Sequence, residues 1–192
     1  MSVRTIAVCC SGDGTNLQAI LSAIRRGVLK ARVGVMICDN PSAYALVRAH
    51  RAKISVVVMD GKGFRSRQAF DRALARVVDR AGARLIVLAG FMRILSPWFV
   101  RRYRGRILNI HPALLPAFPG THAVRDALAH GVKVTGVTVH RVDERVDHGP
   151  ILAQAAVPVR EGDSEESLHE RIHRVEHRLY PRVIQRMLNG KR

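Results

Sequence analysis

The stretch Thr5–Asn16, TIAVCCSGDGTN, decides the fold, because it combines the pattern of a buried strand with a glycine turn and a helix start. Apolar and β-branched residues fill Thr5–Ser11 almost without interruption, which is typical of a strand covered on both faces. Gly12 and Gly14 permit a sharp turn, and the next helix is predicted to begin near Asn16. This sequence of elements indicates the opening unit of an α/β fold.

The alternation of strands and helices continues through the first half of the chain. The predicted elements are strands at Val33–Cys38, Ile54–Met59 and Leu85–Ala89, and helices near Asn16–Arg26, Ala43–Arg51 and Arg67–Ala81. Near-continuous apolar strands separated by helices indicate a mostly parallel sheet that is covered on both faces. Right-handed crossovers then give a doubly wound, Rossmann-like arrangement.

The second half has a different pattern. Its predicted elements are a strand at Ile107–Ile110, the proline-rich loop His111–Gly120 (HPALLPAFPG), a helix near Thr121–His130, strands at Val134–Val142 and Ile151–Val159, and a last amphipathic helix from Asp163-Ser164 to about Leu188. The connection between the last two strands is short, so we expect an antiparallel C-terminal strand pair.

Composition and charge exclude several classes of protein. With 192 residues, 47% of them apolar, the chain is long enough to bury one core without disulfides, and we expect a single domain over 1–192. Cys9, Cys10 and Cys38 form neither a CxxC motif nor a disulfide spacing, which favours the cytoplasm. We find no secretory signal and no apolar run that could span a membrane.

The net charge of +17 admits two interpretations. One is an acidic partner, such as a phosphorylated substrate, a polyanionic folate or RNA. The other is an arginine-rich solvated surface. Because the arginines are scattered and form no block of five or six, we favour the second interpretation.

The glycine loop, Ser11–Asn16, is a candidate phosphate site. Its glycines let backbone N–H groups approach an anion at a helix N-terminus, and Thr15 and Asn16 add polar side chains. It matches neither the P-loop nor GxGxxG, because Leu17 stands where the third glycine belongs. The spacing alone leaves a purely structural strand-to-helix turn equally possible.

A second candidate site lies where Asn109-Ile110-His111-Pro112 ends a predicted strand. Side chains two residues apart on a strand share a side, so Asn109 and His111 can converge. An amide can donate to a developing oxyanion, and an imidazole can move protons. The turn Val142–Pro150 adds three acids, Asp143, Glu144 and Asp147, but spacing does not select one of them. Capping of the loop backbone is the alternative.

The combination of several longer motifs is more specific. They are SGDGTNLQAI, VLAGFMRILSP, ILNIHPALLPAFPG, GVTVHRVDERVDHGPI and GDSEES…EHRLYPRVI. In this order the chain resembles the glycinamide ribonucleotide formyltransferases, a folate-dependent family of purine synthesis, over nearly its full length. The resemblance implies direct formyl transfer from 10-formyltetrahydrofolate to the amine of 5'-phosphoribosylglycinamide through a tetrahedral intermediate, without a metal.

The resemblance also assigns residues. It implies that Asn109 and a cationic His111 stabilise the oxyanion, while Asp147 holds His111 charged and assists proton transfer through water. Substrate binding is assigned to the N-terminal half, and folate binding and catalysis to the C-terminal half. The implied substrate residues are Gly14, Thr15, Asn16 and Glu176. The implied folate residues are Arg67, Met92, Arg93, Ile94, Leu95, Asn109, Arg141, Val142, Asp143, Glu144 and Asp147.

Two residues depart from the pattern of this family. Asp13 puts a carboxylate beside the expected phosphate site, and we expect its side chain to point outward. His148 stands where a glycine commonly follows the catalytic acid, so it can alter the loop or couple to that acid.

His169–His173 is a formal HExxH match, with His177 on the same helix face. Because its helix also carries the core stripe, we do not expect a zinc site there.

Three alternative functions remain. A methionyl-tRNA formyltransferase shares the Asn-x-His arrangement but carries a further C-terminal domain, for which 192 residues leave no room. A formyltetrahydrofolate hydrolase carries an N-terminal regulatory domain. A non-catalytic nucleic-acid-binding protein would use the arginines and would not need Asn109. We expect small-molecule substrates, no membrane or nucleic-acid partner, and a monomer or homodimer.

Overall fold

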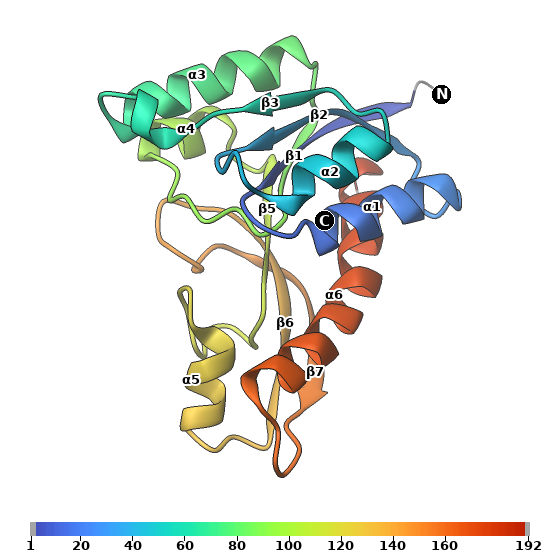
Figure 1. Ribbon diagram of the computed structural model, residues 1–192, viewed down its shortest axis with the longest axis vertical. Coiled ribbons are helices and arrows are strands. Elements are labelled where there is room, and N and C mark those ends of the chain that lie inside the picture. The colour runs from blue at the N-terminus through green and yellow to red at the C-terminus, as the bar shows by residue number, and fades with distance from the viewer. Residues whose placement is uncertain (1–2, 191–192) are drawn as a thin grey trace.

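The computed structural model describes residues 3–190, in which seven strands form one sheet in the order β3-β2-β1-β4-β5-β6-β7 (Figure 1). The strands are β1 (Arg4–Cys10), β2 (Ala31–Cys38), β3 (Val56–Val58), β4 (Leu85–Leu88), β5 (Ile107–His111), β6 (Val134–Arg141) and β7 (Ile151–Pro158). The first five strands pair in parallel, whereas β6 is antiparallel to β5 and β7 is antiparallel to β6. The predicted doubly wound α/β fold with an antiparallel C-terminal strand pair is confirmed.

The helices follow the predicted positions with two additions. They are α1 (Thr15–Arg25), α2 (Tyr44–Arg51), α3 (Arg67–Arg80), α4 (Pro97–Arg102), α5 (Ala123–Ala129) and α6 (Glu165–Leu188), with a 3-10 turn η1 (Gly61–Gly63). Neither α4 nor η1 is among the predicted elements, because segments of six and three residues are too short to show a helical period. The predicted strand Ile54–Met59 is longer than β3, since only Val56–Val58 pair with β2 at the edge of the sheet.

Alternating residues of β1 show why the strand is apolar throughout. Ile6, Val8 and Cys10 belong to the core that the strands share with α1, α2 and α6. Ala7 and Cys9 belong to a second core on the opposite face, beneath α3 and α4. A strand buried on both faces has no polar side to alternate with, which is the reason for its continuous apolar run.

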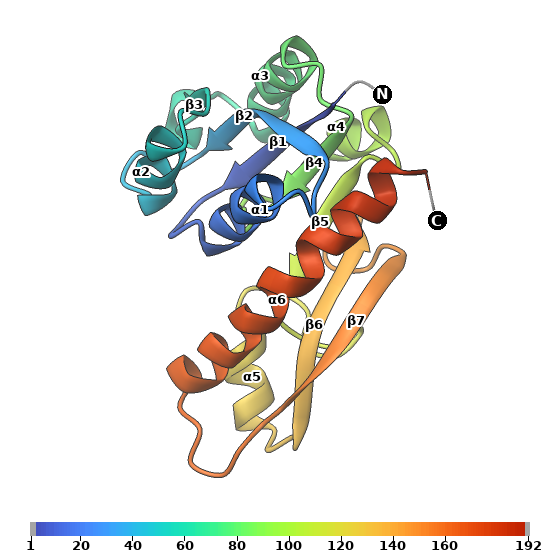
Figure 2. The ribbon, with the colours of Figure 1, turned by 90° about the vertical axis from the view of Figure 1, so that its right-hand side faces the viewer.

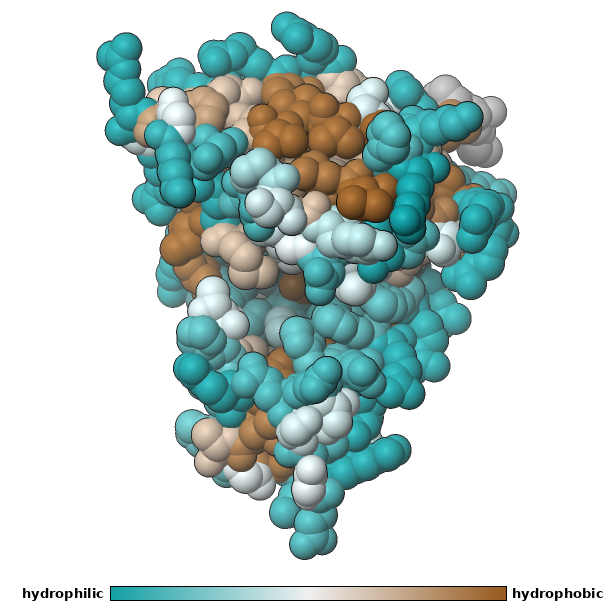
Figure 3. Space-filling model, viewed as in Figure 1, coloured by the Kyte–Doolittle hydropathy of each residue, from teal (hydrophilic) through white to brown (hydrophobic). Residues whose placement is uncertain are grey.

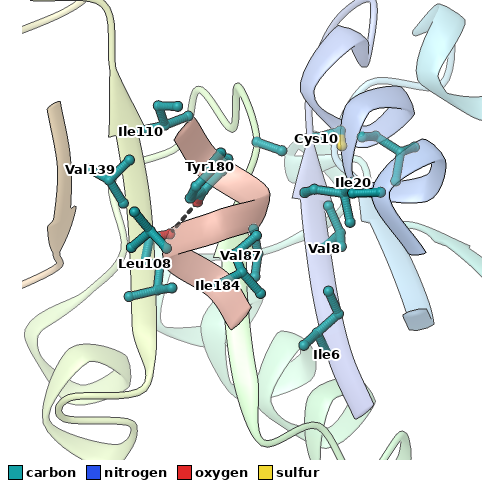
Figure 4. Close-up of a cluster of buried hydrophobic side chains, with 14 of the residues drawn as sticks. Ile6, Val8, Cys10, Ile20, Val87, Leu108, Ile110, Val139, Tyr180 and Ile184 are labelled. Carbon is teal, nitrogen blue, oxygen red and sulfur yellow. Dashed lines mark hydrogen bonds between the residues drawn. The ribbon is translucent and has the colours of Figure 1, made fainter. Parts of the chain in front are cut away.

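Helix α6 joins the two halves of the molecule. It begins at Ser164, whose side chain accepts from the Ser167 N–H in a capping box, and it packs on β6 and β7 near its start and on α1 further along (Figure 2). The buried Tyr180 hydroxyl lies 2.8 Å from the Leu88 carbonyl oxygen of β4 and 3.0 Å from that of Leu108 in β5. Figure 4 shows this ring pointing from α6 into the apolar core beside both strands. It therefore anchors α6 to the end of β4 and the first half of β5.

The face of the molecule drawn in Figure 3 is mostly hydrophilic. Figure 3 shows hydrophilic side chains over most of one face, with apolar surface around the edge strand β3, where Val58 is 45% exposed. Within residues 3–190, no helix combines the length and the apolar character that a membrane span requires.

Candidate active site

A cavity of about 270 Å³ opens where β4 and β5 end. Its walls come from the segment after β4, the end of β5, the proline-rich loop, and the loop between β6 and β7. They are formed by Leu88, Gly90–Leu95, Val100, Asn109–Pro112, Gly120, Thr121, His140, Val142–Asp147 and His169. The carboxyl ends of parallel strands are the usual position of sites in open α/β sheets.

Asn109 is held by His140, which is not among the predicted site residues. In the antiparallel register of β5 and β6 it lies directly opposite His140. The Nδ1 atom of His140 donates to the Arg141 carbonyl oxygen at 3.0 Å, and in the neutral form of the ring Nε2 is then an acceptor. The Asn109 Nδ2 atom lies 3.1 Å from that Nε2 and 3.3 Å from Asp147 Oδ1. Both amide protons therefore have partners, and the carboxamide orientation is fixed.

His111 is buried at the end of β5, with 4% of its surface exposed. Its Nε2 atom is 2.8 Å from the Phe118 carbonyl oxygen, and its Nδ1 atom is 3.4 Å from Asp147 Oδ2. Oxygen acceptors beside both ring nitrogens favour the imidazolium form. Burial lowers the pKa of His111 and outweighs the raising effect of Asp147. That Asp147 keeps His111 charged stays a prediction, because burial and the Asp147 carboxylate shift the pKa of His111 in opposite directions.

Of the three acids in its loop, Asp147 is the one that lies beside Asn109 and His111. Its Oδ2 atom accepts from the Gly120 N–H at 2.9 Å, and its Oδ1 atom accepts from Asn109. Burial raises the pKa of Asp147, but the contacts with His140 and Gly120 and the charge of His111 lower it by more. The side chain is therefore an ionised acceptor at neutral pH. We call Asn109, His111 and Asp147 the trio.

The proline-rich loop is tied down beside the trio by β6 and β7. Thr138 lies opposite His111; its hydroxyl donates to the Ala113 carbonyl at 2.7 Å and accepts from the Leu115 N–H at 3.0 Å. The Gln154 side chain donates to the Leu115 carbonyl at 2.8 Å. These bonds fix the loop that supplies the Phe118 carbonyl and the Gly120 N–H to the trio.

Most of the predicted folate residues lie at the cavity, and two do not. Those that line it are Met92, Arg93, Ile94, Leu95, Asn109, Val142, Asp143, Glu144 and Asp147. Met92 and Ile94 form an apolar rim, 65% and 58% exposed. Arg67 is exposed at the start of α3 and is not part of the lining. The side chain of Arg141 extends to α6, with Nη2 3.8 Å from the Met187 sulfur.

The glycine loop has a steric reason for its second glycine. Gly14 has φ 71°, and an added Cβ would lie 2.7 Å from the Ala45 Cβ of α2. Asp13 is exposed, as expected, and its carbonyl accepts from Arg48 Nε at 2.7 Å. The Met92 N–H donates to the Ser11 hydroxyl at 2.8 Å, which ties the loop to the cavity rim. Phosphate binding by Gly14, Thr15 and Asn16 stays a prediction.

Glu176 lies against this loop. Its Oε2 atom accepts from Asn16 Nδ2 at 2.8 Å, across 160 residues of sequence. Burial raises the pKa of Glu176 to about 7, although the hydrogen bond from Asn16 lowers it in part. The four predicted substrate residues are thus neighbours, and they lie outside the lining of the cavity.

Four further histidines, His148, His169, His173 and His177, contact one another or Asp143. The rings of His169 and His173 are 4.1 Å apart and those of His173 and His177 are 5.8 Å apart, in a row along α6. No group of three or more His, Cys, Asp or Glu side chains suited to a metal occurs within residues 3–190. His148 pairs with Asp143, at 2.8 Å between Nδ1 and Oδ2, and not with Asp147.

Comparison with known proteins adds independent findings. The family described as formyl transferase matches residues 4–184. The chain is 44% identical over 186 residues to phosphoribosylglycinamide formyltransferase of Escherichia coli (strain K12), covering 97% of this chain and 88% of that protein. It is 47% identical to the trifunctional purine biosynthetic protein adenosine-3 of Drosophila melanogaster, covering 97% of this chain and 14% of that protein. The crystal structure of glycinamide ribonucleotide transformylase 1 from Symbiobacterium toebii gives a TM-score of 0.96 at 51% identity, covering 98% and 89% of the two chains.

Proposed function

Since the chain belongs to the formyl transferase family, we propose that it transfers the formyl group of 10-formyltetrahydrofolate to the amine of 5'-phosphoribosylglycinamide, a step of purine biosynthesis. The observation that carries this proposal is the placement of Asp147. Of the three acids in its loop, it alone contacts both Asn109 and His111, and all three members of the trio line the cavity.

The reaction is an acyl transfer between two nitrogens. The substrate amine attacks the formyl carbon and puts negative charge on the formyl oxygen. Breaking the bond between that carbon and N10 of the folate then releases tetrahydrofolate, and one proton moves from the attacking amine to N10. No covalent enzyme intermediate is needed, so the chain must supply oxyanion donors and a proton path.

The trio provides both. Asn109 Nδ2 and His111 Nε2 are the two donors, which now contact protein groups and exchange them for the formyl oxygen when substrate binds. Asp147 faces Nδ1 of His111 and favours the imidazolium as negative charge develops on the substrate. Its carboxylate also accepts a proton of the attacking amine through water and returns it to N10.

The proposed binding sites of the two substrates lie in different parts of one domain. Gly14, Thr15 and Asn16 bind the phosphate of the substrate at the N-terminus of α1, and Glu176 contacts its ribose. The apolar rim of Met92 and Ile94 takes the flat pterin of the folate. The proposal further includes a cytoplasmic location and a monomer or homodimer, and it assigns no metal.

The test is a side-by-side assay of acceptor choice. The purified protein is supplied with 10-formyltetrahydrofolate and either phosphoribosylglycinamide or charged initiator tRNA, and formylated product is measured. We expect formylation of the small amine only. Transfer to the tRNA alone would overturn the substrate, and tetrahydrofolate release without an acceptor would point to a hydrolase.

A further inference from the structure

The loop between β6 and β7 carries Asp147 in a disfavoured backbone conformation. Asp147 has φ 50°, a left-handed value that residues other than glycine rarely adopt. The base of the loop is closed, because the Arg141 N–H donates to the Pro150 carbonyl at 2.9 Å. Gly149 packs so tightly beneath Arg141 that an added Cβ would overlap its carbonyl oxygen. The middle of the loop, which holds Asp147, needs contacts of its own.

One such contact runs from His148 back to Asp143. His148 Nδ1 donates to Asp143 Oδ2 at 2.8 Å, while the other carboxylate oxygen accepts from the Arg145 N–H at 2.9 Å. His148 follows Asp147 directly, and Asp143 precedes Asp147 by four residues. The contact therefore closes residues 143–148 into a ring that contains Asp147.

The two partners of this contact face different surroundings. Asp143 lines the cavity beside Asp147, whereas His148 is absent from the lining and its side chain is 47% exposed. Burial raises the pKa of the Asp143 carboxyl, and the bonds from His148 and the Arg145 N–H lower it by more. His148 therefore acts on the cavity only through Asp143, from the outer side of the loop.

Charge makes this contact matter for an anionic ligand. The loop puts three carboxylates at one wall of the cavity: Asp143, Glu144 and Asp147. Glu144 is paired with Arg101 at 3.1 Å, and Asp147 is surrounded by donors of the trio and Gly120. Asp143 has His148 as its cationic partner when the imidazole is protonated. Without that partner, Asp143 keeps only the bond from the Arg145 N–H, and its free oxygen would turn more readily into the cavity and repel the carboxylates that every folate carries.

We propose that His148 is a positioning residue for the folate, which clamps Asp143 against the outer side of the loop and keeps the ring around Asp147 closed. The inference rests on the proposed function, because it assumes an anionic folate in this cavity. It assigns His148 no contact with the reacting atoms. An exposed pair of this kind contributes modestly, so the expected change in folate affinity is about two- to fivefold.

The experiment compares four variants with the wild-type protein: His148→Ala, His148→Asn, Asp143→Ala and the double variant His148→Ala/Asp143→Ala. Tetrahydrofolate affinity is measured by calorimetry, and KM for each substrate by formyl-transfer kinetics. His50→Ala, an exposed histidine of α2 outside the cavity, is the matched control. Thermal unfolding of every variant is recorded alongside.

We expect His148→Ala to weaken folate binding about two- to fivefold, with KM for the amine and the unfolding temperature unchanged. His148→Asn, whose amide N–H can take the place of Nδ1–H, should recover most of the loss. In the Asp143→Ala background, the second change should have no further effect.

Wild-type folate affinity in His148→Ala overturns the clamp, as does an equal loss with and without Asp143. A loss shared by KM for both substrates and by thermal stability also overturns it, because that is general loop damage. The proposed function fails separately, if the wild-type protein binds tetrahydrofolate but formylates no amine. In that case the calorimetric comparison still decides the clamp.

Discussion

The glycine loop and the trio differ in how far apart their residues lie in the sequence. The turn of the glycine loop is made by six consecutive residues. Its most restricted position is Gly14, where an added Cβ would lie 2.7 Å from the Ala45 Cβ. The trio combines β5 with a loop 38 residues further along, and its geometry depends on the register between β5 and β6. The glycine turn therefore follows from local backbone conformation together with one close contact from α2, whereas the trio exists only in the assembled sheet.

The largest effect is expected from substitutions in the trio. Asp147→Asn keeps the shape of the side chain but removes the charge beside His111, and Asn109→Ala removes an oxyanion donor. Each change should lower kcat by about a thousandfold and leave the fold intact. Single-turnover formyl transfer and circular dichroism are the measurements. Asp126→Asn, at a side chain of α5 that is 41% exposed, is the control, and an equal loss in that variant would contradict the assignment.

The next effect concerns the bond between the glycine loop and α6. The pKa of Glu176 is raised from 4.5 to about 7 in the folded protein, so the native state holds a proton there that the unfolded chain releases. Stability is therefore expected to fall as pH rises from about 4.5 to 7, by on the order of 3 kcal/mol.

Urea unfolding of wild type and Glu176→Gln at pH 5 and pH 7.5 measures this slope. The neutral variant should lose less stability than wild type over the interval. Parallel curves for the two proteins would show that Glu176 does not titrate in this range.

A smaller effect is expected from His140, which the register between β5 and β6 places opposite Asn109. His140→Ala leaves one Asn109 amide proton without its acceptor and should lower kcat by about tenfold to a hundredfold. His140→Gln can present a carbonyl oxygen near the position of Nε2 and should retain most of the activity. Steady-state kinetics on both variants decides this, and equal losses would mean that the ring itself, not its acceptor, is required.

The smallest effect sharpens the steric account of the glycine loop. Gly14 and Gly131 have similar backbone angles, φ 71° and 69°, but an added Cβ at Gly131 would meet nothing within 4 Å. Gly14→Ala should therefore be less stable than Gly131→Ala by about 1 kcal/mol, through overpacking on Ala45. Chemical denaturation of the pair measures the difference. Equal stabilities would leave the backbone angle as the only reason for glycine.

The sequence predicts the parts of this molecule that leave a local signature. The apolar run of β1, the proline-rich loop and the start of the last helix after Asp163-Ser164 are of this kind, and the structure confirms all three. The short helix α4 leaves no such period, and the ends of β3 follow from its pairing with β2 rather than from its own residues. The same limit applies to the site.

His140 shows the limit most clearly. It became visible as a functional residue only when the register of β5 and β6 placed it opposite Asn109, and a predicted antiparallel pairing of these strands would have been the signal. Arg141 is the reverse case, since its neighbours in the motif line the cavity while its own side chain follows the strand alternation to α6. Side-chain direction of this kind follows from the pleat and not from the motif.

Helix α6 sets a condition on how the protein is made. It is the last element of the described chain, and it brings both Glu176 to the glycine loop and Tyr180 to β4 and β5. During synthesis from the N-terminus, the glycine loop and all seven strands emerge before their partners on this helix. The contacts of the glycine loop, β4 and β5 with this helix are therefore completed only after α6 has left the ribosome and docked, so a growing chain can form the earlier strands before it gains these contacts.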